Sequence, residues 1–502
     1  MDTNRNIFRR YSDVWFYAFI FVALWIFFTQ IHPLVPFDTD DWLYMGNSRT
    51  PFPSMSEKNP TKVFCELSEP LVANIGAFVI MPIVGDWVTA QIHALAITLA
   101  LFIVVYLLLV QRLVTARFHL DKFRSYCIIS LFVLLHFLIL RTRTADNDFL
   151  WYSRDVTCYF HYTLPNLLNA SLVLWLMRHN PQQITSIRTH SLLLLTVYLA
   201  LCSSLYASVI LIAYVGALLI GHLVNALRSH KPWLRSYVRD NYYYLAIIVA
   251  WMGIQLFEIN GNRANAYGNV DSPFLPTLLE SARTFANLQY CSWFIVLTGL
   301  VVIAAKVCSW HHGHRQVLYT ERRTLHLGLA LLLSIAYLIL LSSKVFPAYL
   351  RKGDVVFCYA FFALLIFVWL LGYLCARSRH TVLILPLAIF CVFFKLNSKG
   401  NTFRDVQHWN RTDVQTCIQF SRDVVQQVRQ ADTQGQDTCV ITVPYYNDGS
   451  NWPFDYAHSQ FVGKTLFQHN VTRREIVTIF QCNPPVSTPV EEVTEEVEDA
   501  EN

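Results

Sequence analysis

The stretch at 37–44, which reads FDTDDWLY, concentrates side chains that could do chemistry. Asp38, Asp40 and Asp41 supply three carboxylates, and Trp42 follows at once. The stretch comes directly after the first long apolar run, so we expect it at a membrane face, where charge is costly unless it is solvated, paired or used. Repulsion between the adjacent Asp40 and Asp41 would raise one pKa, which suits a general base. The alternative is a solvated loop whose short side chains cap local turns.

The composition indicates a membrane protein. Of the 502 residues, 54% are hydrophobic and only 15% are charged, which is too apolar for a soluble protein of this size. Several apolar runs are about 17–25 residues long, enough to cross a bilayer as helices. The net charge of +5 is small, and the basic residues cluster between the runs, which is typical of topology signals and not of nucleic-acid binding. We therefore expect an α-helical polytopic membrane protein.

The distribution of basic residues sets the expected orientation. Arg5, Arg9 and Arg10 precede the first run and place the N-terminus in the cytoplasm. The first run is too long and too aromatic for a cleaved signal peptide, so we interpret it as a retained anchor. About eleven spans are expected, and this odd number leaves the C-terminus outside. The expected spans are 14–31, 87–110, 125–140, 162–177, 191–203, 208–227, 242–259, 291–307, 325–342, 355–374 and 382–394.

One apolar run, at 71–84, is not counted as a span. If it crossed the membrane, the basic group that includes Arg112 and Arg124 would lie outside. We therefore expect a helix that lies along the outer interface, within an external loop at 32–86.

The chain turns polar after the last span. The transmembrane module is expected to occupy 1–396 and an external α/β domain 397–487. That domain is expected to contain an amphipathic helix at 413–429 and alternating strands at 437–443 and 475–480. The acidic end at 488–502 is expected to be disordered.

The 12 cysteines form no CxxC pair, so neither a metal framework nor any other metal site is expected. Cys439 begins one expected strand and Cys482 follows the other. If the two strands are antiparallel neighbours in an oxidising compartment, a disulfide between these cysteines is expected.

External loops are usually poor in Lys and Arg, yet several basic residues fall in the loops assigned to the outside. They are Arg141, Arg143, Arg154, Arg263, Arg351 and Lys352. Each could simply contact lipid headgroups. As a group on the side of the aspartates, they predict a site for a phosphate-bearing lipid, because arginine pairs well with phosphate oxygens. A carboxylate that takes a proton from an alcohol and fixed positive charge that stabilises a leaving phosphate would together suit glycosyl transfer.

Three aromatic residues lie close to these charges in the sequence. Trp42, Trp151 and Tyr162 offer flat faces on which a sugar ring could stack. Packing in the aromatic belt of the membrane interface is the alternative for each. No Walker motif and no GxGxxG is present, so neither ATP nor a nucleotide-linked donor is indicated, and no cofactor is expected.

Four stretches in order along the chain resemble bacterial multi-pass glycosyltransferases of the GT-C superfamily, and most closely the Gtr-type transferases that modify O-antigen and related surface glycans. They are DTDDW, EPLVANIGAFVIMPIVGDW, DFLWYSRDVTCYFHYTLPNLLNA and FEINGNRANAYG. The tight turn CSSLYAS, in which family members often carry an acidic residue, has none here. This departure counts against a second catalytic carboxylate in that turn.

The resemblance implies a donor sugar on a polyprenyl phosphate, a hydroxyl of a lipid-linked or surface glycan as acceptor, and an inverting single displacement without a metal. Asp40 and Asp41 match the catalytic acids of the family, and Arg263 its phosphate-side arginine. The implied location is the bacterial inner (plasma) membrane. A flippase and a polyprenyl-phosphate glycosyltransferase would be the pathway partners.

Two other classes remain open at this stage. A secondary transporter or lipid-glycan flippase also needs many spans, although such proteins usually place charges near the bilayer midplane. A ligase or polymerase that uses a diphosphate-linked glycan would share most of the expected site.

The expected orientation gives a direct prediction. A reporter enzyme that is active only outside the cytoplasm, fused to the C-terminus, should be active, because an odd number of spans follows a cytoplasmic N-terminus. A signal from a cytoplasm-specific reporter at the same position would invert the assignment of every loop beyond at least one span.

Overall fold

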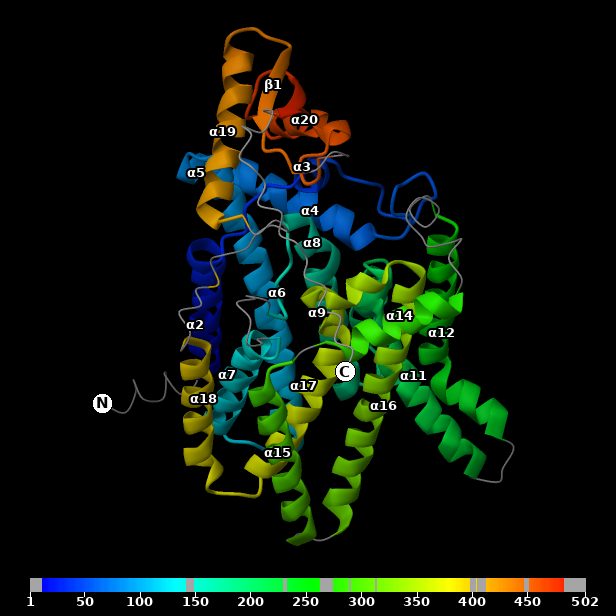
Figure 1. The fold of residues 1–502 in the computed structure, drawn as a ribbon. Coiled ribbons are helices and arrows are strands. Elements are labelled where there is room, and N and C mark those ends of the chain that lie inside the picture. Colours follow the sequence, from blue (N-terminus) through cyan, green and yellow to red (C-terminus); the bar gives the residue numbers. More distant parts are fainter. Residues whose placement is uncertain are drawn as a thin grey trace, which may run out of the picture.

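The computed structural model describes residues 11–140, 149–228, 233–261, 274–288, 290–311, 314–397, 403, 412–446 and 451–482. Long helices run side by side in the larger part of the molecule, and a smaller α/β unit covers one end (Figure 1). The helices of the first half are α2 (Ser12–Ile26), η1 (Phe27–Ile31), α3 (Thr39–Gly46), α4 (Val63–Ile75), η2 (Gly76–Ile80), α5 (Met81–Val84), α6 (Trp87–Phe118), α7 (Lys122–Leu138), α8 (Val156–Cys158), η3 (Tyr159–Thr163), α9 (Leu164–Arg178), η4 (Pro181–Gln183), α10 (Ile187–Leu201), α11 (Leu205–Arg228) and α12 (Trp233–Ile259). They are followed by α14 (Phe274–Ala286), α15 (Ser292–His311), α16 (His314–Lys344), η5 (Pro347–Arg351), α17 (Gly353–Cys375), α18 (Thr381–Asn397), α19 (Val414–Thr433), β1 (Thr438–Val443), η6 (Tyr456–His458), α20 (Gln460–Gln468) and β2 (Val477–Cys482).

Eight helical stretches of the described chain are long and apolar enough to cross a membrane. They are Ser12–Ile31, Val63–Val84, Trp87–Phe118, Leu205–Arg228, Trp233–Ile259, Ser292–Trp310, Arg322–Lys344 and Gly353–Cys375. The fold is therefore that of a helical membrane protein. Each of the eleven expected spans falls on a helix, but those at 125–140, 162–177, 191–203 and 382–394 fall on the shorter helices α7, α9, α10 and α18.

The expected interfacial helix at 71–84 is the second half of a longer helical stretch that begins at Val63. By length and composition alone this stretch could cross a bilayer. In Figure 1, however, α4 and α5 run across the upper end of α6 and not alongside it. This course is the one expected of a helix that lies along an interface.

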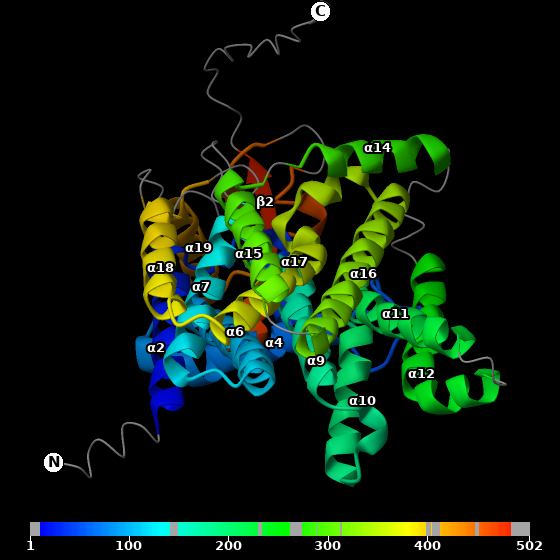
Figure 2. The ribbon, with the colours of Figure 1, turned by 90° about the horizontal axis from the view of Figure 1, so that it is seen from below.

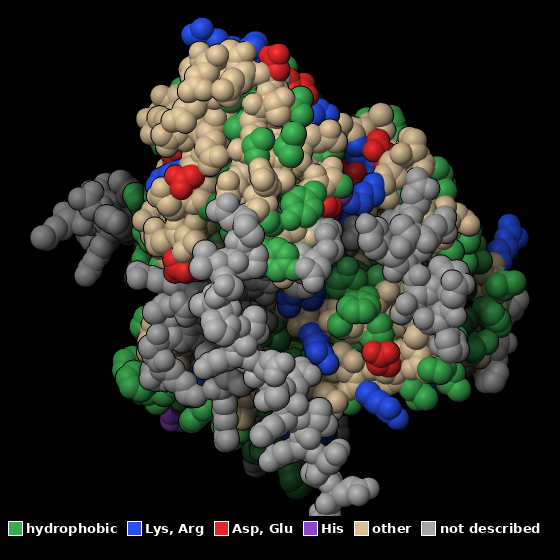
Figure 3. All heavy atoms as spheres, turned by 45° about the horizontal axis from the view of Figure 1, so that its top comes forward, with side chains coloured by type: hydrophobic (Ala, Val, Ile, Leu, Met, Phe, Trp, Pro, Cys, Tyr) green, Lys and Arg blue, Asp and Glu red, His purple; other side chains and the backbone are tan. Residues whose placement is uncertain are grey.

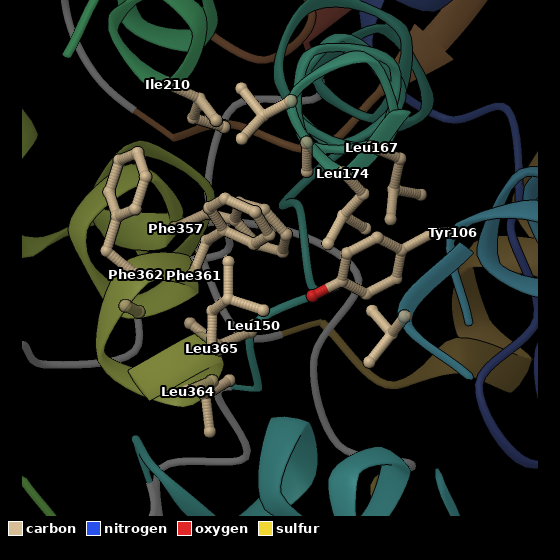
Figure 4. Packing of buried hydrophobic residues seen from close by; sticks show 14 of the residues in the cluster. Tyr106, Leu150, Leu167, Leu174, Ile210, Phe357, Phe361, Phe362, Leu364 and Leu365 are labelled. Carbon is tan, nitrogen blue, oxygen red and sulfur yellow. The ribbon is translucent and has the colours of Figure 1, made fainter. Parts of the chain in front are cut away.

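Helix α17 lies at the centre of the helical part and is buried over most of its length. Figure 4 shows how Phe357 and Phe361 of this helix face Tyr106 of α6 and leucines of α9. All three aromatic residues are fully buried, and the two phenylalanine rings stack. Close packing of this kind holds helices together in a bilayer, where no hydrophobic effect acts between them.

The C-terminal unit contains the expected helix and both expected strands, but the strands pair in parallel, not antiparallel as the disulfide prediction required. Cys439 lies opposite Thr478, and Cys482 lies opposite Val443. Four residues of register separate the two cysteines, roughly 13 Å along a strand, which is beyond the reach of a disulfide. The predicted Cys439–Cys482 bond is therefore wrong, and both cysteines are free thiols.

The C-terminal unit shares a hydrophobic core with the loop that follows the first span. This core contains Val35, Phe37, Trp42, Met45 and Trp87 together with residues of α19, α20 and both strands. The indole rings of Trp42 and Trp87 stack with centroids 5.1 Å apart. Hydrogen bonds also join the two parts, because Thr465 Oγ1 donates to the carbonyl of Trp42 and Thr39 Oγ1 donates to that of Pro453, both at 2.6 Å.

The shared core predicts that Trp42→Ala destabilises the C-terminal unit by about 3–5 kcal/mol, since it leaves a cavity between two parts that pack as one. Thermal unfolding and limited proteolysis of the purified protein in detergent would measure the loss. Trp310→Ala is the matched control, because that side chain is 87% exposed. Equal stability of the two variants would contradict a shared core.

Candidate functional site

The FDTDDW stretch folds as the start of helix α3. Asp38 is the N-cap residue, and its side chain accepts a hydrogen bond from the amide of Asp40 at 3.0 Å. Asp41 is the third residue of the helix, and its side chain accepts from the amide of Asp38. This reciprocal pair is a capping box, which satisfies amides that a helix start leaves without partners. Asp38 and Asp41 therefore stabilise the start of the helix.

Asp41 also fixes a second segment. Its Oδ2 accepts from the amide of Phe37 at 2.9 Å, and its Oδ1 accepts from the amide of Thr157 at 2.8 Å. The side chain is fully buried. Burial and the nearby charge of Asp155 raise the pKa of Asp41 to about 8, although the backbone donors oppose this shift. Asp41 thus ties the start of α3 to α8, and its oxygens are occupied by backbone amides.

Asp40 differs from its two neighbours because it is only half buried. Its charge is one of the causes that raise the pKa values of Asp38 and Asp155, so its carboxylate lies near both. Of the two aspartates predicted to be catalytic, Asp40 is the one that a substrate could reach without breaking the helix cap.

Lys352 lies beside two other acidic residues, Asp155 and Asp354. It immediately follows η5 and is the N-cap residue of α17. Its Nζ donates to Cys158 Sγ at 3.8 Å and lies 4.8 Å from the ring centroid of Tyr162. Burial alone would lower the pKa of Lys352, but the neighbouring Cys158, Asp354 and Asp155 outweigh it and hold this pKa well above its usual range. The ammonium group therefore stays charged.

Three further acidic residues belong to this region, although none of them was predicted to be a site residue. Asp155 accepts from the amide of Cys158, and its pKa is raised by burial despite the opposing charge of Lys352. Glu69 Oε1 accepts from Thr157 Oγ1 at 3.0 Å, and Asp354 Oδ2 accepts from Ser153 Oγ at 2.9 Å.

Glu69 and Asp354 are almost completely buried, and each has a second oxygen without a hydrogen-bond partner within the described part of the chain. We call Asp38, Asp40, Asp41, Glu69, Asp155 and Asp354 the carboxylate cluster. One sequence feature could have revealed these residues, because acidic side chains inside or beside apolar runs are energetically costly to bury unless they are functional. Within the described residues, no group of His, Cys, Asp and Glu side chains has a geometry that could hold a metal ion.

The three predicted sugar-stacking aromatics separate into two kinds. Trp42 is 2% exposed and lies in the shared core, and Trp151 is fully buried and stacks on His136 at 4.4 Å. The burial of both tryptophans counts against the prediction that they stack on a sugar, because neither side chain is open to a ligand in this structure. Tyr162 is also mostly buried, but it lies in the site, next to Lys352.

A cavity of about 380 Å³ opens between α14 and the end of η5. It is lined by Glu280, Arg283, Thr284, Asn287, Leu288 and Arg351. Arg351 and Lys352 are adjacent in sequence, so this dipeptide contributes one cation to the cavity and the other to the cluster. Figure 3 shows Lys and Arg side chains around a hollow of this face, below the C-terminal unit.

The other predicted phosphate-binding residues have different outcomes. Arg154 is half buried, and its charge acts on Asp354, so it borders the cluster. Arg141, Arg143 and Arg263 lie outside the described residues. The predicted cations that the structure describes, Arg154, Arg351 and Lys352, are thus found together.

Comparison with family models, with curated proteins and with solved structures finds no match to this chain. The fold and the site define a helical membrane protein in which carboxylates and cations from distant segments meet at one end of the helical part.

The cluster makes a prediction about pH. Burial, followed by the charges of Asp155 and Asp41, raises the pKa of Asp38 well above its usual range. The folded state therefore keeps a proton that the unfolded state loses, and the free energy of unfolding should fall as the pH rises above about 4, where an aspartate in the unfolded chain ionises. Asp38→Asn should flatten this fall, because asparagine caps a helix equally well without adding charge.

Thermal unfolding in detergent across this pH range would measure the effect. Asp240→Asn, at an exposed position, should keep the wild-type slope. If Asp38→Asn left the pH dependence of the free energy of unfolding unchanged, buried Asp38 would not be its cause.

Proposed function

We propose that this protein is a membrane glycosyltransferase of the GT-C type. It would move a hexose from a polyprenyl-phosphate carrier to a hydroxyl of a surface or lipid-linked glycan. The resemblance of the sequence to Gtr-type transferases favours glucose as that hexose. The observation that carries the proposal is the Arg351–Lys352 dipeptide, because it joins a cluster of carboxylates to a cavity lined by two arginines. A proton acceptor and an anion site are the two parts that such a transfer needs.

The proposed reaction assigns one role to each part. Asp40 takes the proton of the acceptor hydroxyl, and the acceptor oxygen forms a bond to the anomeric carbon of the donor sugar. The bond from that carbon to the phosphate oxygen breaks, and its electron pair remains on the phosphate. A single displacement of this kind inverts the anomeric configuration. Asp41 holds α3 against α8 and is a positioning residue, since backbone amides occupy its oxygens.

The cavity is the proposed entrance for the phosphate of the carrier. Arg283 and Arg351 are both exposed there, and arginine pairs with phosphate oxygens through parallel donors. The cavity is also lined by one acidic residue, Glu280, which lies on α14. Helix α14 exposes Phe274, Leu275 and Leu279, so its apolar side could contact lipid while its polar side lines the cavity.

The proposed setting is the bacterial inner membrane, crossed about eleven times, with the N-terminus in the cytoplasm and the C-terminal domain outside. The eight long apolar helices support a membrane location. Helices α7, α9, α10 and α18 would supply the remaining spans, and the Val63–Val84 stretch would lie on the outer surface. No cofactor or metal is part of the proposal.

A donor with a diphosphate-linked glycan is the second candidate, because the arginines of the cavity and Lys352 provide two neighbouring cationic positions. Transfer assays with monophosphate-linked and diphosphate-linked donors would separate the two. A transporter is favoured less. Asp354 and Glu258 lie near the ends of α17 and α12 and not at their midpoints, where transporters usually place such charges.

The proposed base gives a sharp prediction. Asp40→Asn should fold and insert normally but lower the rate of transfer by about 10²–10⁴-fold, since it removes the proton acceptor. Transfer from a short-chain polyprenyl-phosphate glucose in proteoliposomes would measure the loss. Glu57→Gln is the matched control, because it removes a carboxylate from the same external loop.

Full transfer by Asp40→Asn would show that Asp40 is not the base. If the wild-type protein transferred sugar from neither the monophosphate-linked nor the diphosphate-linked donor, the proposed function itself would fail.

A further inference from the structure

Three aromatic side chains of the C-terminal unit reach its surface where the two parallel strands end. Tyr445 follows β1 and is 42% exposed, Tyr456 begins η6 and is 41% exposed, and Trp452 lies between them in the sequence and is half buried. In open α/β sheets, ligands usually bind beyond the carboxyl ends of the strands. Residues 443–460 include no lysine and no arginine. This end of the sheet therefore carries aromatic rings without the cations that an anionic ligand would need.

Tyr445 and Tyr456 are neighbours in the folded chain. The hydroxyl of Tyr456 lies 2.8 Å from Cys482 Sγ at the end of β2, and that sulfur donates to the carbonyl of Pro444, which follows β1, at 3.7 Å. The hydrogen bond with Cys482, followed by burial and the charges of Cys482 and Tyr445, raises the pKa of Tyr456 to about 12. This effect requires the two tyrosines to lie close together, so their rings belong to one exposed surface.

Asn451 fixes the segments that carry these rings. It is fully buried, its Oδ1 accepts from the amide of Tyr446 at 2.7 Å, and its Nδ2 donates to the carbonyl of Pro444 at 3.0 Å. Its φ of +58° lies in the left-handed region, which asparagine tolerates better than most residues. The amide of Phe454 donates to the carbonyl of Asn451 at 2.9 Å, and the ring of Phe454 is buried in the shared core. A surface held in this way has little ordering left to do when it binds a ligand.

Two polar side chains of the same segment add hydrogen-bonding groups. His458 Nδ1 lies 2.5 Å from Asp455 Oδ2, and because an ionised carboxylate only accepts, Nδ1 carries the proton. Nε2 of the neutral ring is then an acceptor, and the histidine side chain is partly exposed. Aromatic faces beside fixed polar groups suit an uncharged ligand with many hydroxyls, which is the chemistry of a glycan. We call the following residues the aromatic platform: Tyr445, Trp452, Asp455, Tyr456 and His458.

The aromatic platform is joined to the residue beside the proposed base. The carbonyl of Pro453 accepts from both the amide and the hydroxyl of Thr39, at 3.1 and 2.6 Å, and Thr39 immediately precedes Asp40. Helix η6 contacts α3, and α20 also packs against α3 (Figure 1). Three residues of chain lead from Pro453 to Tyr456, which is at most about 10 Å. Tyr456 therefore lies within the reach of a short chain of sugars whose end is at Asp40.

We propose that the aromatic platform binds the acceptor, and that the acceptor is an uncharged chain of several sugars. This inference rests on the proposed function, which left the acceptor open between a surface glycan and a lipid-linked one. The platform holds sugars of the chain that do not react, while the hydroxyl that is modified lies at Asp40. Its residues bind the acceptor and take no part in the displacement. A single sugar on a lipid would reach Asp40 without using the platform, so the structure favours a polymeric acceptor.

Binding of glycans by the full-length protein in nanodiscs tests the platform without turnover. The probes are immobilised neutral oligosaccharides of increasing length and uronic-acid oligosaccharides of the same lengths. Neutral chains should bind more tightly as they lengthen, and the acidic chains should not bind. Tyr445→Ala and Tyr456→Ala should each weaken binding by about fivefold to tenfold, because each removes an aromatic contact. Tyr456→Trp, which keeps a ring, should bind nearly as well as the wild type.

Phe467→Ala is the matched control, because Phe467 is a partly exposed aromatic residue of the same unit that lies on α20. It should leave the affinity for neutral chains unchanged.

Three results would overturn the proposal. The first is that the wild-type protein binds none of the neutral chains, and the second is that both alanine variants bind them unchanged. The third is that the two tyrosines support binding to phosphatidylglycerol vesicles and not to glycans, because the platform would then be a contact for lipid. Tyr445→Ala provides an independent variant if Tyr456→Ala does not fold, as judged by gel filtration and thermal unfolding.

Kinetics separate this inference from the proposed function. In Tyr456→Ala, the KM for a long neutral acceptor should rise by about fivefold to tenfold while kcat and the KM for the donor stay unchanged, because the platform contributes binding alone. Transfer to a monosaccharide glycoside should not change. If the wild-type protein binds neutral chains through these tyrosines but transfers no sugar, the glycan-binding platform stands and the proposed function fails. If it transfers sugar and both alanine variants keep the wild-type KM for long acceptors, the proposed function stands and this inference fails.

Discussion

The site depends on the cost of burying negative charge. Asp38 and Asp41 are fully buried, and Glu69 and Asp354 nearly so. An isolated carboxylate in such a place would be strongly unfavourable. The structure offsets this cost with backbone amides, hydroxyls and Lys352, and these partners come from segments far apart in the sequence. Because each acid needs its partners, α3, α4, α8 and the start of α17 are held in one arrangement.

The same constraint divides the work among neighbouring residues. The oxygens of Asp41 accept hydrogen bonds from the amides of Phe37, Asp38 and Thr157. Asp40, one residue earlier, is only half buried. Arg351 and Lys352 are divided in a similar way, with one side chain in the cavity and the other beside Tyr162. A helix start and a short turn can thus send adjacent side chains into different environments, so adjacent residues of one type need not share a role.

The C-terminal unit belongs to this arrangement. Its core is continuous with Phe37 and Trp42, and Ser421 Oγ donates to the carbonyl of Pro36 at 2.6 Å. The indole of Trp87 at the start of α6 donates to His469 Nδ1 at 3.3 Å. The unit therefore fixes both the loop that carries the aspartates and the first turn of α6. Its effect on the site is to hold these segments in place, since none of the described residues that line the cavity comes from it.

The sequence by itself determined the class of the protein and the positions of its long apolar helices and of α19, but not those of α3, α14 and α20. Long apolar runs identify membrane helices because the bilayer demands about 20 apolar residues per span, and alternation identified both strands of the C-terminal unit. Periodicity carries no information on strand direction, so the parallel pairing of β1 and β2, which leaves Cys439 and Cys482 apart, was decided by the tertiary structure. Residue type likewise could not distinguish a tryptophan that packs against Trp87 from one that faces a ligand. Only the folded chain brings Asp155 and Asp354 to Lys352 and Glu69 to Asp41 and Thr157, because burial and charge depend on neighbours that are distant in sequence.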